Sequence, residues 1–274
     1  MIRKRIRAAA LVLAALFCCT LCGCGAKKAG AEEVQLQTKD GTPVADVDVL
    51  QFRRPVQDAL VAVLDTDRGE VSVLLFPEAA PQAVQNFVTL ARQGAYDGLD
   101  FLQVAKDYLV QTGDTDGYGG ESIWGSAFPA EVSDLLHHYT GALAMAGGAE
   151  NNSQFYVVNS TADSVTEELL TQMREAGWSE DVIAAYTQVG GAPWLDNNYT
   201  VFGQVFYGMD AVRKIGGTAP ESGTRPEEPA KLLQVSVTTF GAWCEAHPDA
   251  VPVFAAPQQK GGQEASDVPE GSAD

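Results

Sequence analysis

The stretch from about residue 58 to residue 243 consists of many short β-like segments, and this pattern limits the fold more than any other feature. Glycine, aspartate and asparagine separate these segments, as is typical of short strands. A helix is predicted after Pro81, which suits a first helical turn, and a shorter one after Met209. The pattern predicts a mainly β domain with helices covering its ends, either a closed barrel or an antiparallel sandwich. The expected strands lie near residues 60–64, 71–76, 99–104, 108–112, 140–146, 154–158, 199–206 and 232–237.

Residues 165–189 interrupt the β pattern. Their composition predicts two short helices joined at Ala176-Gly177, and the second is expected to begin after Ser179 as its capping residue. We interpret the segment as a helical insertion into the β domain. Its many apolar residues either shape a substrate groove or pack on the domain as a stabilising cap.

The first 23 residues are typical of an export signal. Basic side chains between Arg3 and Arg7 precede an uncharged, mostly apolar stretch from Ala8 to Leu21. At ~14 residues this stretch is too short to cross a ~30 Å hydrocarbon core as a helix, which disfavours a transmembrane anchor. It ends in Leu21-Cys22-Gly23-Cys24, which resembles a bacterial lipobox. We therefore expect a signal peptide over residues 1–23 and a lipid on Cys24 that holds the protein on the outer side of a bacterial cell membrane.

Two polar segments flank the predicted domain of residues 58–243. Residues 24–57 are interpreted as a membrane tether and N-terminal extension. Residues 244–274 are rich in proline, glycine, glutamine and acids, and such a composition buries too little apolar surface to offset its ordering entropy. A disordered acidic tail is therefore predicted.

Charge and cysteine usage exclude several classes of protein. The whole chain has 18 basic and 36 acidic residues, and removal of residues 1–23 leaves 14 basic and 36 acidic residues, a formal charge of −22. No basic patch is evident, so nucleic acid is not an expected partner. Of the five cysteines only Cys244 follows Cys24, so no disulfide is expected in the acylated chain. With no Cys/His spacing typical of zinc sites, we expect no metal or cofactor, and we expect a monomer.

Several short motifs follow one another in a single order. They are Ala80-Pro81 through Asn86-Phe87, Tyr96-Asp97-Gly98-Leu99-Asp100-Phe101, Gln111-Thr112-Gly113-Asp114, Gly141 through Ala146, Asn152-Ser153-Gln154-Phe155-Tyr156-Val157, Trp194-Leu195-Asp196 and Thr200-Val201-Phe202-Gly203-Gln204-Val205. Each is weak alone, but together they resemble the signature of the cyclophilin family of peptidyl-prolyl isomerases. The resemblance runs from Leu60 to near Phe240. It implies a closed eight-stranded barrel, capped by two helices, with a shallow proline pocket on its outer surface.

The resemblance also assigns roles to individual residues. Gln103, Tyr108 and Gln111 fall at catalytic positions. The implied substrate-binding residues are Leu109, Ala146, Gly147, Gln154, Tyr156, Trp194, Leu195 and Tyr199. Such a set combines an apolar slot for the prolyl ring with amides that fix the flanking peptide. Taken singly, Tyr108, Leu109 and Tyr156 would be ordinary core or sheet-face residues.

The sequence departs from the family at its central catalytic position. Family members carry Phe-His-Arg-Val where this chain has Phe101-Leu102-Gln103-Val104, so Gln103 replaces the arginine. Tyr108 and Tyr199 stand where the family has Phe and His, and the loop from Met145 to Gln154 is shorter. The loss of ~1.5–4 kcal/mol of transition-state stabilisation would slow turnover about 10- to 1,000-fold. The nearest cations in sequence are Arg92 and Lys106.

Two functions follow from the resemblance. The first is a surface-tethered peptidyl-prolyl isomerase of reduced rate that helps exported proteins to fold by acting on their proline-containing segments. The second is a binding module or scaffold that holds such segments without turnover. The retained pocket residues favour the enzyme, whereas Gln103 favours the binder.

Overall fold

The computed structural model of the chain describes residues 36–37, 43–44, 49–252 and 254. The predicted signal peptide, the lipid site at Cys24, most of the tether and residues 255–274 of the predicted tail lie outside these residues. No helix in the described ranges is long and apolar enough to cross a membrane. The helices, with short 3-10 turns labelled η, are η1 (Leu50–Phe52), α1 (Pro81–Arg92), η2 (Ala162–Ser164), α2 (Glu167–Glu175), α3 (Glu180–Val189), η3 (Pro193–Leu195), α4 (Met209–Gly216) and α5 (Phe240–Ala246).

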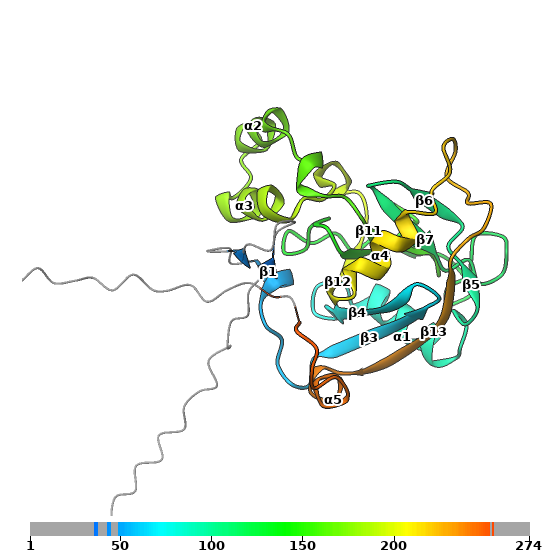
Figure 1. Cartoon of the computed structure of the whole chain (residues 1–274). Coiled ribbons are helices and arrows are strands. Elements are labelled where there is room, and N and C mark those ends of the chain that lie inside the picture. The colour runs from blue at the N-terminus through cyan, green and yellow to red at the C-terminus, as the bar shows by residue number, and fades with distance from the viewer. Residues whose placement is uncertain (1–35, 38–42, 45–48, 253, 255–274) are drawn as a thin grey trace, which may run out of the picture. The chain divides into compact units, whose positions relative to one another are not determined.

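The main structural unit is a curled antiparallel sheet with the strand order β5-β13-β3-β4-β12-β9-β11-β7-β6 (Figure 1). Two short pairs, β1 with β2 and β8 with β10, stand apart from it. The strands are β1 (Leu36–Gln37), β2 (Pro43–Val44), β3 (Leu60–Thr66), β4 (Gly69–Leu75), β5 (Leu99–Asp100), β6 (Gln103–Ala105), β7 (Leu109–Thr112), β8 (Phe128–Pro129), β9 (Ala142–Met145), β10 (Glu150–Asn151), β11 (Phe155–Val158), β12 (Val201–Tyr207) and β13 (Lys231–Thr239). The predicted mainly β class is confirmed.

The predicted closed, eight-stranded barrel is wrong. In the described residues the main sheet has nine strands, and its end strands β5 and β6 do not pair with each other. The segment 217–230 meets β6 instead at one backbone bond, from the Val104 amide to the Thr224 carbonyl, and its prolines Pro220, Pro226 and Pro229 cannot donate to a regular ladder. The sheet is therefore a curled, open structure.

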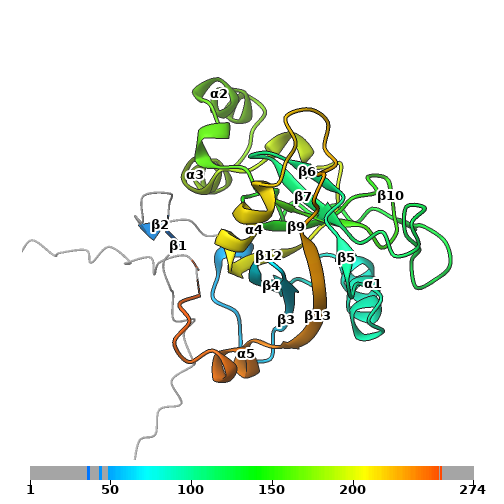
Figure 2. The same ribbon diagram turned by 45° about the vertical axis from the view of Figure 1, so that its right-hand side comes forward.

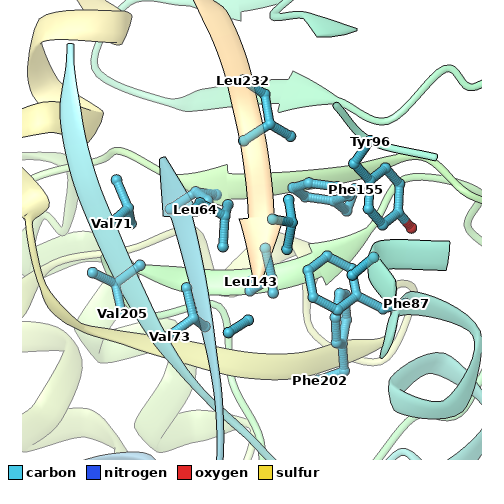
Figure 3. Packing of buried hydrophobic residues seen from close by; sticks show 14 of the residues in the cluster. Leu64, Val71, Val73, Phe87, Tyr96, Leu143, Phe155, Phe202, Val205 and Leu232 are labelled. Atoms are coloured by element: carbon cyan, nitrogen blue, oxygen red, sulfur yellow. The ribbon is translucent and has the colours of Figure 1, made fainter. Parts of the chain in front are cut away.

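One face of the sheet encloses the hydrophobic core together with α1 and α4. Phe87 of α1 packs edge-on against Phe155 with ring centroids 5.2 Å apart, and it lies 5.4 Å from Phe202 (Figure 3). Helix α1 begins at Pro81, and its first turn is capped by the Glu131 carboxylate, which accepts from the Gln82 and Ala83 amides at 3.0 and 2.9 Å. Because α1 is fixed at its start, its apolar face is directed into the core.

Both helices predicted for the insertion are present, and each begins at a side-chain cap. Thr166 caps α2 and Ser179 caps α3 by accepting the amides of Leu169 and Val182. The apolar residues of the pair join a separate buried cluster that also contains Phe52. The cluster is formed by Val49, Phe52, Tyr139, Leu170, Met173, Ile183, Ala185 and Tyr186. Most of the apolar surface of the insertion is thus buried, as the cap alternative requires.

Both predicted domain boundaries fall inside packed structure. Helix α5 continues past residue 243 to Ala246, and Phe254 is only 1% exposed, with its ring 5.5 Å from that of Phe206. At the other end, Phe52 is equally buried, although residue 52 was assigned to the tether. Isolated aromatic residues thus pack the described ends of both polar segments into buried clusters.

Candidate active site

The predicted site lies on the face of the sheet that points away from the core. Residues directly opposite each other on antiparallel strands share a face. The partners Gln103 and Gln111, Gln111 and Tyr156, and Tyr156 and Ala144 therefore form one row across β6, β7, β11 and β9. The alternating residues on the same strands point into the core and are Val104, Val110, Leu143, Met145, Phe155 and Val157.

Two amide side chains at the row are bonded to each other. The Gln111 Nε2 donates to Gln154 Oε1 at 2.8 Å, and the Ala146 backbone amide donates to the Gln154 carbonyl at 3.0 Å. These bonds fix the loop that carries Ala146 and Gln154 against β7. The remaining Gln111 oxygen and Gln154 amino group have no partner in the described part of the chain, so both can bind the backbone of a peptide.

An aromatic pair forms one side of the site. The rings of Tyr108 and Trp194 lie 5.9 Å apart, and Trp194 Nε1 donates a hydrogen bond to the Tyr108 hydroxyl at 3.3 Å. Trp194 is 50% exposed, which is high for tryptophan. Five predicted site residues are half-buried and pack against the apolar cluster that contains Tyr156: Tyr108, Leu109, Ala146, Leu195 and Tyr199. The result is an apolar surface rimmed by neutral hydrogen-bonding groups.

Gly147 lets the short loop after β9 close tightly. A Cβ at this position would collide with the Glu150 carbonyl oxygen. The next residue, Gly148, has a φ of +65° and faces the ring of Tyr199 at 3.6 Å from the place of a Cβ. The loop is thus held beside the aromatic residues, and all the predicted catalytic and substrate-binding residues lie in one region. Their individual roles remain predictions.

The sequence profile described as cyclophilin type peptidyl-prolyl cis-trans isomerase/CLD matches residues 61–237. This chain belongs to the cyclophilin family. A candidate peptidyl-prolyl cis-trans isomerase of Staphylococcus epidermidis is 40% identical over 181 residues, covering 64% of this chain and 91% of that protein. A Staphylococcus aureus counterpart is 40% identical over 173 residues, covering 61% and 87%. The prediction of an isomerase is confirmed at the level of the family.

Solved structures support the same fold. A cyclophilin type peptidyl-prolyl cis-trans isomerase of Cryptosporidium parvum, crystallised in the presence of the dipeptide Ala-Pro, superposes with a TM-score of 0.52. The alignment covers 65% of this chain and 99% of that protein at 22% identity. At this identity the likeness concerns the cyclophilin fold only.

Next to the row, this cyclophilin contains a buried polar network centred on Asp196. Its carboxylate contacts His137 Nδ1 at 2.8 Å, His138 Nδ1 at 2.6 Å and the Tyr186 hydroxyl at 2.7 Å, and it accepts the His138 backbone amide at 2.8 Å. His138 Nε2 lies 3.0 Å from the Tyr156 hydroxyl. The network therefore joins α3 of the insertion, through Tyr186, to the site residue Tyr156.

The network keeps Asp196 ionised and its tyrosines neutral. Burial raises the pKa of Asp196, but hydrogen bonds from His137 and His138 outweigh burial and hold it below its usual value. Because an ionised carboxylate can only accept, both histidine Nδ1 atoms donate to it. Burial raises the pKa of Tyr156 and Tyr186, and the Asp196 charge adds to both shifts. Both hydroxyls thus act as neutral hydrogen-bonding groups.

Sequence reasoning did not find this network. It assigned no role to His137 or His138, and it used Asp196 only as part of the Trp-Leu-Asp motif. The one available signal was that an aspartate beside a pocket tryptophan needs partners if it is buried. Those partners lie 58 to 59 residues away for the histidines, and Tyr186 belongs to the insertion.

Away from the row, the described residues include a cavity but no metal site. In the described ranges no group of three or more His, Cys, Asp or Glu residues could hold a metal ion. A cavity of about 440 Å³ is lined by residues from the segment 50–60 and from the end of β4, including Arg53 and Arg54. None of the predicted site residues lines this cavity.

Proposed function

We propose that this cyclophilin isomerises Xaa-Pro bonds in exported polypeptides, at a rate lowered by Gln103. The observation that carries the proposal is the arrangement of Gln111, Gln154 and the exposed Trp194 around a half-buried apolar surface. Uncatalysed prolyl isomerisation takes tens of seconds or longer, which is slow enough to limit folding. Proline-containing segments of folding chains are the corresponding substrates.

The reaction makes and breaks no covalent bond, because only rotation about the C–N bond of the prolyl amide is needed. The prolyl ring rests on the half-buried Leu109 and Leu195, which pack against the apolar cluster that contains the buried Tyr156. Gln111 and Gln154 hold the flanking peptide through neutral hydrogen bonds. A rotation barrier of ~20 kcal/mol falls when a donor binds the twisted amide more strongly than the planar one. At this point Gln103 offers a neutral donor where a charge-assisted bond would be roughly twice as strong.

Exchange spectroscopy on an Ala-Pro peptide with the detergent-solubilised full chain tests the proposal. Catalytic amounts of protein are expected to increase the rate of exchange between cis and trans signals. Peptide binding without faster exchange would rule out turnover. That outcome would support the second candidate, a proline-peptide-binding module, which is favoured by the neutral Gln103 on the exposed part of β6.

The proposed setting is the outer surface of a bacterial membrane, with the protein anchored by a lipid on Cys24. The support is the Leu21-Cys22-Gly23-Cys24 segment after a short apolar stretch. Mass spectrometry of the mature protein is expected to find Cys24 as an acylated N-terminal residue. The variant Cys24→Ala should remain unprocessed, whereas the neighbouring change Cys22→Ala should not prevent acylation. A mature N-terminus elsewhere, without lipid, would contradict the prediction.

A further inference from the structure

The open edge of the sheet brings a second segment to the position of Gln103. The Phe101 amide donates to the Ala230 carbonyl at 2.9 Å, and the Val104 amide donates to the Thr224 carbonyl at 2.7 Å. Figure 2 shows the link between α4 and β13, which contains these acceptors, beside β6. The two segments run in opposite directions, since acceptor numbers fall as donor numbers rise.

One backbone hydrogen bond brings Arg225 close to Gln103. The Val104 amide donates to the Thr224 carbonyl, so Gln103 directly precedes the donor residue and Arg225 directly follows the acceptor residue. Thr224 and Arg225 are exposed, whereas the next residue, Pro226, is buried. Gln103 is exposed as well, so the side chains of Arg225 and Gln103 are both open to a bound peptide at the same edge of the sheet.

The Arg225 side chain also has no interaction partner within the described ranges. It forms no hydrogen bond, ion pair or ring contact in that part of the chain, and the acidic neighbours Glu227 and Glu228 do not pair with it. The nearest cations in sequence are less well placed. Lys106 lies in the turn after β6, and Arg92 lies in the last turn of α1, whose apolar face packs in the core.

We propose that Arg225 is a catalytic residue that supplies the guanidinium missing at Gln103. The inference rests on the proposed isomerase function. The Arg225 side chain crosses Gln103 and donates to the prolyl nitrogen or the preceding carbonyl oxygen as the amide twists. Twisting removes amide resonance and leaves a lone pair on nitrogen, so a cationic donor binds the twisted state more strongly than the planar one. No proton or electron is transferred, and the fork shape of arginine suits the task better than lysine.

The test measures kcat/KM for Ala-Pro peptide isomerisation in the full chain. Arg225→Ala is expected to lower kcat/KM about tenfold. Arg225→Lys should give a kcat/KM between those of the wild type and Arg225→Ala, because lysine keeps the charge but lacks the planar guanidinium. Since Arg225 is exposed and unpaired, the melting temperature of both variants should match that of the wild type. Lys106→Ala and Arg92→Ala, which remove a cation elsewhere, should leave kcat/KM unchanged.

A double-variant cycle with Gln103→Arg separates catalysis from a general charge effect. With arginine at position 103, Arg225→Ala should change kcat/KM by less than about twofold, because one guanidinium suffices. An equal loss in both backgrounds, or no loss with Gln103 present, would overturn the role of Arg225 while leaving the isomerase function in place. A wild-type protein that binds the peptide but does not accelerate its exchange would overturn both.

Discussion

Gln103→Arg is expected to raise kcat/KM for prolyl isomerisation at least about tenfold. The new guanidinium would stand on β6, opposite Gln111, where pairing with β7 fixes its backbone. A residue on a strand is held more firmly than Arg225 on an irregular segment, so the gain should appear even with Arg225 present. The measurement is the same peptide exchange assay, read at substrate concentrations well below KM.

Ala105→Arg is the matched control, because residue 105 lies two positions along β6 and shares the face of Gln103. It adds the same charge without placing it opposite Gln111, and it should give little gain. Equal gains from both variants would reduce the effect to electrostatic attraction of the peptide. No gain from Gln103→Arg in either the wild-type or the Arg225→Ala background would contradict the prediction.

Asp196→Asn is expected to lower the free energy of unfolding by about 3 kcal/mol, because it replaces a buried carboxylate that accepts hydrogen bonds from two histidines and a tyrosine. The amide can accept at one atom only, and its amino group would face donors. Denaturant unfolding at pH 7 measures the change. Asp134→Asn, which removes one exposed charge next to the same segment, should have little effect.

The effect of Asp196 should depend on pH in a defined direction. Its folded pKa lies below the usual 3.8, so the carboxylate contributes its full stabilisation above the unfolded pKa and loses it as pH falls through the folded one. The stability difference between the wild type and Asp196→Asn should therefore be constant near neutral pH and shrink below about pH 4. A difference that grows on acidification would contradict the ionised state assigned to Asp196.

The residues of the candidate site could be predicted from the sequence, but the buried contacts around Asp196 that lie beside them could not. Gln111, Gln154 and Trp194 could be found because each stands in a short motif whose order is recognisable. Asp196 stands in one of these motifs, but its partner Tyr186 belongs to the insertion, which has no motif. Side-chain partners separated by many residues leave no local pattern, so only the fold can bring them together.

The same limit applies to the sheet edge. Gln103 could be recognised as the replacement of the family's arginine. The cations nearest to it in the sequence, however, are Arg92 and Lys106. Arg225 lies far along the chain and reaches β6 through one backbone bond between Val104 and Thr224. The closed barrel was expected for a related reason, because periodicity identifies strands but does not reveal which edges remain unpaired.

The pairing of β13 with β3 has a consequence for how the chain folds during synthesis. Strand β3 can pair with β13 only after β13 has been synthesised. The Lys231 amide, which donates to the Asp67 carboxylate, lies 164 residues downstream of Asp67. Until then the β3–β4 hairpin has an exposed edge, which can pair with other chains. Such late, non-local pairing slows folding. A nascent chain truncated before Lys231 should consequently aggregate or recruit a chaperone. The domain should be completed when β13 emerges from the ribosome and pairs with β3.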